Sequence, residues 1–171
     1  ADLDVNGKVF ISGDVTIDTH NTTDDGTINF SSTIDGVSGG ADDDLVILAG
    51  DTDAGASLTI TGNIGDGVPL TTLKINESAG TVALSIPQIG GGTAAGVTGQ
   101  VDIGNSNTAR IDVNGNLDFG TGNVTFIAGS GGTDFTTTNP TVDMNQTVTN
   151  GDGAADGGNF KITGAVEISD G

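Results

Sequence analysis

A split internal repeat constrains this chain more than any other feature. Residues 97–126 read VTGQVDIGNSNTARIDVNGNLDFGTGNVTF. The second half of this unit recurs at the start of the chain, where residues 3–7 and 13–17 match residues 111–115 and 122–126. One residue is inserted between the two matching parts of the internal copy. A supersecondary unit that returns far along a chain is typical of repeat architectures.

The first half of the same unit recurs at the other end, because residues 162–168 match residues 97–103. Written as a circle, the sequence restores the whole unit across its two ends, with a gap two residues shorter than in the internal copy. We therefore expect residues 1–171 to form one segment with open ends that continue into neighbouring copies. Covalent tandem copies and separate subunits stacked head to tail both satisfy this pattern.

Short strands separated by Gly, Asn and Asp turns fill nearly the whole sequence. Alternation such as Leu58-Thr59-Ile60 argues against disorder, and no window carries the periodicity of an amphipathic helix. We expect strands near residues 3–5, 8–11, 15–18, 27–30, 45–48, 57–61, 72–75, 81–84, 97–103, 110–113, 116–119, 123–127, 142–144, 146–149, 159–163 and 165–168.

Repeat spacing predicts an all-β fold, a right-handed parallel β-helix (β-solenoid). The two pairs of matching segments lie 108 and 65 residues apart, near-multiples of about 21 to 22 residues, which gives about eight coils. At ~4.8 Å per rung, eight coils extend about 38 Å. The alternative is a β-sandwich, which needs longer strands and usually a buried aromatic residue.

Stacked Val, Ile, Leu and Phe side chains should form the interior of this solenoid. Asn6, Asn114 and the glycines beside them are expected to turn corners with left-handed backbone angles. Pro69, Pro87 and Pro140 should lie at turns or strand starts. Irregular loops are expected at residues 36–44, 89–96, 130–140 and 150–158.

The formal net charge of −19, with only four Lys and Arg residues, disfavours nucleic acids and anionic membranes as partners. Cysteine is absent, which leaves no disulfide or thiolate chemistry. No apolar run approaches the roughly 20 residues of a membrane span. The chain begins directly before a predicted strand, so we expect a secretion signal, if there is one, on a precursor.

Runs such as GDVTIDTHNTTDDGTINFSSTIDG and LTITGNIGDGVPLTTLKI resemble the repeat regions of filamentous-haemagglutinin-like bacterial surface adhesins. This resemblance implies a secreted right-handed β-solenoid that serves as an extracellular or cell-surface stalk or fibre. It supplies no catalytic residue.

Residues suited to catalysis are few and scattered. Carboxylate chemistry needs a cleft and a tuned partner, and Glu77 and Glu167 lie in ordinary polar positions. Arg110 is the only arginine and His20 the only histidine, and a salt-bridging residue and a surface turn residue are the simpler interpretations. We therefore predict no catalytic residue, no resident cofactor and no enzymatic activity; a solenoid hydrolase or lyase would need carboxylates converging with Arg110 or His20.

Calcium is the one ligand for which the sequence offers oxygen donors, although no complete calcium-binding motif is present. The candidates, for which a solvated acidic face is the simpler interpretation, are Asp42, Asp43, Asp44, Asp51, Asp53, Asp152 and Asp156. Asn-x-Ser/Thr sequons, expected to be surface-accessible, begin at Asn21, Asn29, Asn76, Asn123 and Asn145.

These observations favour a structural, non-enzymatic extracellular module that extends a fibre. Its partner would be itself, because an uncapped solenoid end exposes unpaired backbone groups and an open core. The alternative is an adhesin binding module that presents a lateral site for a glycan or calcium.

Overall fold

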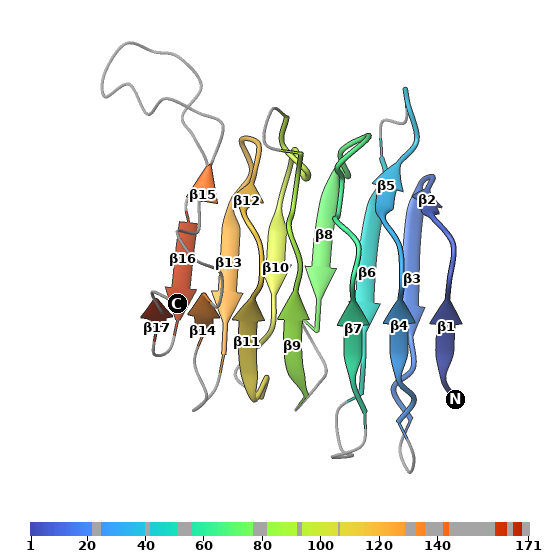
Figure 1. Cartoon of the computed structure of the whole chain (residues 1–171), viewed down its shortest axis with the longest axis vertical. Coiled ribbons are helices and arrows are strands. Elements are labelled where there is room, and N and C mark those ends of the chain that lie inside the picture. The colour runs from blue at the N-terminus through green and yellow to red at the C-terminus, as the bar shows by residue number, and fades with distance from the viewer. Residues whose placement is uncertain are drawn as a thin grey trace.

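The computed structural model is an all-β solenoid (Figure 1). It describes residues 1–21, 25–39, 42–50, 56–76, 82–91, 94–105, 107–128, 133–135, 142–143, 160–163 and 166–168, and no helix occurs among them. The strands of this part are β1 (Leu3–Val5), β2 (Val9–Ile11), β3 (Asp14–Asp18), β4 (Ile28–Phe30), β5 (Ile34–Gly36), β6 (Asp44–Leu48), β7 (Leu58–Ile60), β8 (Thr72–Ile75), β9 (Ala83–Ile86), β10 (Val101–Ile103), β11 (Arg110–Val113), β12 (Leu117–Asp118), β13 (Val124–Ile127), β14 (Thr133–Phe135), β15 (Val142–Asp143), β16 (Phe160–Thr163) and β17 (Val166–Ile168).

Two parallel sheets face each other along the solenoid. The seven-stranded sheet has the order β1-β4-β7-β9-β11-β14-β17, and the six-stranded sheet has the order β16-β13-β10-β8-β6-β3. A third ladder connects them at one edge: it contains the pairs β2-β5 and β12-β15, joined by single bridges through Ile64 and Ile89. Each coil therefore visits the seven-stranded sheet, the third ladder and the six-stranded sheet in turn.

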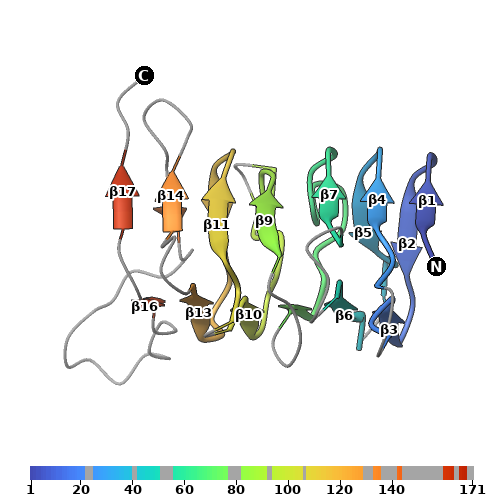
Figure 2. The ribbon, with the colours of Figure 1, turned by 90° about the horizontal axis from the view of Figure 1, so that it is seen from below.

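The chain advances steadily from β1 at one end to β17 at the other. In Figures 1 and 2 it rises along the seven-stranded sheet, crosses over and descends along the six-stranded sheet, which is a right-handed winding. Neighbouring strands in every paired ladder of the described chain are parallel, whereas a β-sandwich is built from antiparallel sheets. The predicted class, a parallel β-solenoid, is confirmed.

The expected count of about eight coils is wrong, because the longest sheet contains seven strands and the second contains six. The coils are longer on average than the repeat spacing predicted, and they differ in length. Leu3 pairs with Ile28, and Ile28 pairs with Leu58, so the second of these coils takes more residues than the first. The coil that joins Ile111 to Thr133 is shorter than both. The additional residues lie between the described strands, and the spacing of two repeats could not reveal them.

The core is a stack of aliphatic residues with three phenylalanines. In β7 the side chains of Leu58 and Ile60 are buried, and Thr59 between them faces solvent. The same alternation places Leu58 directly between Ile28 and Leu84 of the adjacent coils. Phe30, Phe119 and Phe126 are the largest fully buried side chains of the described part. The predicted interior of Val, Ile, Leu and Phe is confirmed for these residues, whereas Phe10 on β2 is 62% exposed.

Local predictions failed where a strand is short and polar. β5 and β14 were missed, and β14 lies inside the loop predicted at residues 130–140. The run predicted as a strand at residues 97–103 is ordered as β10 only from Val101 onwards. The loop predicted at 150–158, the strand at 146–149 and Pro140 lie outside the described residues.

Corner residues were located correctly but given the wrong conformation. Asn6 and Asn114 follow β1 and β11, yet neither has positive φ. Among the described residues the left-handed non-glycine position is Asn76, with φ of 52°, at the end of β8. The buried Asn76 Oδ1 accepts a hydrogen bond from the Ala49 backbone N–H at 2.7 Å, which offsets the cost of this conformation.

The structure confirms one half of the repeat and contradicts the other. Residues 3–7 and 111–115 both follow the seven-stranded sheet into its corner, and residues 13–17 and 122–126 both enter the six-stranded sheet. Residues 166–168, however, form β17 in the seven-stranded sheet, whereas the matching residues 101–103 form β10 in the six-stranded sheet. Similar apolar-acidic-apolar triplets suit a strand of either sheet, so this match carried no information about the face.

Candidate functional site

The first coil, formed by β1, β2 and β3, is the outermost layer at the N-terminal end. β1 pairs only with β4, β2 only with β5, and β3 only with β6 among the described strands. Five apolar side chains of this coil that point toward the core are only partly buried: Leu3, Val5, Val9, Val15 and Ile17. Their register partners in the next coil are buried: Ile28, Phe30, Ile34, Leu45 and Ile47.

Backbone hydrogen bonding at this end is one-sided. The Leu3 N–H donates to the Thr27 carbonyl at 2.8 Å, and the Val5 carbonyl accepts from the Ser31 N–H at 2.9 Å. In a parallel strand the groups of the intervening residue, here Asp4, face the opposite side. Among the described strands no partner lies there. The first coil therefore presents edge strands above a partly open core.

Side chains on the outer face fasten the first coil to the second. The Thr27 backbone N–H donates to Asp2 Oδ1 at 2.9 Å, and the Asn29 amide donates to Asp4 Oδ1 at 3.3 Å. The first of these hydrogen bonds holds the pKa of the exposed Asp2 carboxyl below its usual range. These contacts fix the coil in register although only one of its sides is covered.

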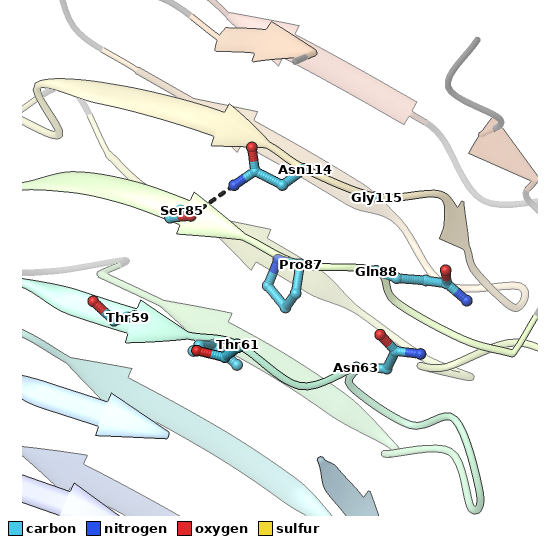
Figure 3. Close-up of a pocket in the computed structure, with 9 residues that line it drawn as sticks. Thr59, Thr61, Asn63, Ser85, Pro87, Gln88, Asn114 and Gly115 are labelled. Carbon is cyan, nitrogen blue, oxygen red and sulfur yellow. Dashed lines mark hydrogen bonds between the residues drawn. The ribbon is translucent and has the colours of Figure 1, made fainter. Parts of the chain in front are cut away.

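A second feature is a lateral hollow of about 400 Å³ on the outer surface of the third, fourth and fifth coils. It lies where the seven-stranded sheet turns into the third ladder, and Figure 3 shows the side chains around it. The lining residues are Thr59, Ile60, Thr61, Asn63, Ser85, Pro87, Gln88, Asn114 and Gly115.

The hollow lies at a corner that is one position shorter than its neighbours. The last core residue before the corner and the first core residue after it are Ile60 and Ile64 in the third coil, four positions apart. In the fourth coil the equivalent residues are Ile86 and Ile89, three positions apart. The shorter corner places Pro87 between the lining residues of the third coil and those of the fifth (Figure 3). Sequence reasoning missed the hollow, and this spacing was the signal that could have found it.

The residues considered for catalysis do not converge. Arg110, exposed on β11 in the fifth coil, forms an ion pair with Asp112 of the same strand. His20 is exposed after β3 in the first coil, where its backbone N–H donates to Asp18. Glu77 lies outside the described residues, and Glu167 belongs to β17, whose side chains are not described.

Of the acidic residues considered for calcium, Asp43 has a role in the local loop structure. Asp43 is buried, and its Oδ2 accepts a hydrogen bond from the Val37 N–H at 2.8 Å. Asp42 is exposed, and no group of three or more potential metal-ligating acidic or imidazole side chains occurs within the described ranges. Asp51, Asp53, Asp152 and Asp156 lie outside those ranges.

The sequons differ in accessibility. Asn21 and Asn123 are exposed and Asn29 is partly exposed. Asn76 is fully buried, so the expectation that it is surface-accessible is wrong: its side chain is needed inside, against Ala49. Asn145 is outside the described residues.

Comparison of the chain with models of known protein families, with curated protein sequences and with solved structures finds no match. In the part of the chain that the structure describes, no helix is long and apolar enough to cross a bilayer.

Proposed function

We propose that this chain is a structural, non-enzymatic module that stacks end to end with copies of itself to build an extracellular fibre. The observation that carries the proposal is the first coil, with its five partly buried core-facing residues and edge strands paired on one side only. Covering that coil with another would add backbone hydrogen bonds and bury its apolar layer. Stacking of this kind is heterologous and does not close, so it produces a filament.

The repeat supports a covering coil of the same kind as the coils already in the chain. Two segments of the fifth coil, residues 111–115 and 122–126, match residues 3–7 and 13–17 of the first, and the fourth coil lies on the side of the fifth that the first coil leaves open. Ile111 and Val113 of the fifth coil are fully buried under Leu84 and Ile86. The first coil thus repeats a surface that, four coils later, accepts a coil.

At the other end the last strands β15, β16 and β17 are the outermost members of their ladders in the described chain. A second copy would place its first coil there. Tandem copies in one polypeptide and separate subunits both create this join, and the proposal covers both forms.

The remaining parts of the proposal rest on charge and on resemblance. A net charge of −19 on a narrow solenoid makes lateral association of fibres unfavourable while the ends remain free to stack. The strand-and-turn runs that resemble filamentous-haemagglutinin-like adhesins support a stalk or matrix fibre at a cell surface. Arg110 lies on the fifth coil and His20 on the first, and this separation supports a non-enzymatic role.

Electron microscopy of the purified chain at increasing concentration tests the proposal. We expect thin fibres with an axial repeat of about 29–34 Å, which is six to seven rungs at ~4.8 Å. Compact particles of uniform size at every concentration would refute end-to-end stacking of this chain.

A further inference from the structure

The lateral hollow is electrically neutral on a strongly acidic protein. None of its nine lining residues is charged, although the chain has 23 Asp and Glu residues. The carboxylate nearest in register is Asp112, the partner of Ser85, and it is paired with Arg110. A charged ligand would find no opposite charge in the hollow. The lining therefore fits a neutral, polar ligand.

Some hydrogen-bonding groups of the hollow are bonded to other residues of the chain, and others are available to a ligand. The Asn114 amide donates to Ser85 Oγ at 2.7 Å, and the Gln88 amide donates to the Gly90 carbonyl at 2.8 Å, which leaves Gln88 Oε1 as an acceptor. The side chains of Thr59, Thr61 and Asn63 make no hydrogen bond to any described residue. Hydrogen-bond donors and acceptors thus line the same hollow (Figure 3).

The base of the hollow is apolar. Pro87 lies between the polar groups of the third and fifth coils (Figure 3), and the buried Ile60 also lines the hollow. A surface with an apolar base and neutral hydrogen-bonding walls matches a sugar ring, which has a C–H face and a rim of hydroxyl groups. The hollow spans three rungs at ~4.8 Å, and one rung is close to the length of one pyranose unit.

We propose that this hollow is a binding site for a neutral saccharide chain that runs along the solenoid axis and occupies about two sugar units within the site. Thr61 and Asn63 of the third coil bind ring hydroxyls at one end, and Asn114 of the fifth coil binds them at the other. Gln88 and Pro87 of the fourth coil contact the saccharide between these ends. The site lies on the third to fifth coils, so it is separate from the first coil and does not depend on stacking.

Amide NMR titration of the whole chain tests this site. The probes are three neutral oligosaccharides of different linkage, maltoheptaose, cellohexaose and chitohexaose, with oligogalacturonate as the anionic control. At least one neutral probe should shift resonances confined to residues 59–63, 85–88 and 114–115, and the anionic probe should bind at least fivefold more weakly. Shifts with none of the neutral probes, shifts elsewhere, or equal binding of oligogalacturonate would overturn the proposal.

Two variants separate the site from the fold. The double variant Thr61→Val with Asn63→Ala removes polar groups at the surface and should weaken binding at least fivefold with an unchanged unfolding midpoint. Thr16→Val, at an exposed position of β3, is the matched control and should bind as the wild type does. Insertion of a glycine between Pro87 and Gln88 restores the four-position corner and should abolish binding. If the insertion does not fold, the double variant alone decides, and wild-type affinity in it would refute the site.

Discussion

The first and fifth coils share two matching sequence segments and have different surroundings. Leu3, Val5 and Val15 are partly buried, whereas Ile111, Val113 and Val124 at the equivalent positions are fully buried. The two coils differ in the number of coils packed against them. Among the described strands, the fifth coil lies between the fourth and the sixth, and the first coil contacts the second alone. The first coil therefore has apolar residues at the positions where the fifth coil, which is covered on both sides, has its buried core residues.

Corner glycines extend the same comparison to the backbone. A Cβ on Gly115 would lie 2.5 Å from the Gln88 nitrogen of the preceding coil, and one on Gly62 would lie 2.3 Å from the Ser32 carbonyl carbon. Gly7 occupies the matching corner of the first coil, and a Cβ there meets nothing within 4 Å. Glycine is sterically required at this corner in the third and fifth coils, whereas Ser32 occupies it in the second coil, beside the first coil. The presence of glycine at position 7 fits the stacking proposal.

The largest expected effect is the loss of a core side chain. Ile111→Ala should lower the free energy of unfolding by about 3 kcal/mol, because it leaves a cavity in a fully enclosed layer. Leu3→Ala removes a partly exposed group and should cost about 1 kcal/mol in the monomer. Denaturant unfolding at low protein concentration measures both. Equal losses would show that the first coil is already enclosed and would contradict the comparison.

Corner glycines should give the next largest effect. Gly115→Ala forces two backbones apart and should cost about 1–3 kcal/mol. Gly7→Ala, which has free space around it, should change the free energy of unfolding of the monomer by no more than about 0.5 kcal/mol. A large loss for Gly7→Ala in the dilute monomer would mean that position 7 is crowded within a single chain.

A small effect on stability is expected from Asp2, which accepts a hydrogen bond from the Thr27 N–H of the second coil. Its pKa is lowered by the Thr27 N–H, so the folded state favours the carboxylate. The resulting contribution to stability is present above the ordinary Asp pKa and is lost as pH falls through the lowered value in the folded state. An NMR titration of the Asp2 carboxyl should show the lowered pKa, and Thr27→Pro, which lacks the N–H, should return it toward the usual value. A titration that is the same in both proteins would show that this hydrogen bond is not formed in solution.

Much of the fold could be predicted from local patterns, because an alternating strand such as β7 reports which of its sides is buried. Parallel stacking followed from the recurrence of residues 3–17 at 111–126. Coil length could not be predicted, because two repeat spacings do not determine loops of different size. The match of residues 162–168 to residues 97–103 gave a wrong expectation about the sheet, because a Val-Glu-Ile triplet fits a strand of either sheet.

The two candidate sites differed in how far they could be predicted. Open ends were predicted from the repeat, and they remain a prediction; the free space beside Gly7 became visible only by comparison with the corners of the other coils. The lateral hollow lies at a corner that is one position shorter, at Pro87, which is visible only after the coils are aligned. Asn76 was predicted to be a surface sequon, because its sequence context does not reveal that the distant backbone N–H of Ala49 needs its oxygen.

The central claim is that the first coil is built to be covered by another copy, and Gly7→Ala tests it most directly. Sedimentation velocity over a range of concentrations would compare this variant with the wild type and with Thr16→Ala, an exposed lateral change on the same coil. We predict concentration-dependent association of the wild type and of Thr16→Ala, and association at least tenfold weaker for Gly7→Ala with an unchanged monomer fold. Association of Gly7→Ala equal to that of the wild type, or a wild type that remains monomeric throughout, would contradict the claim.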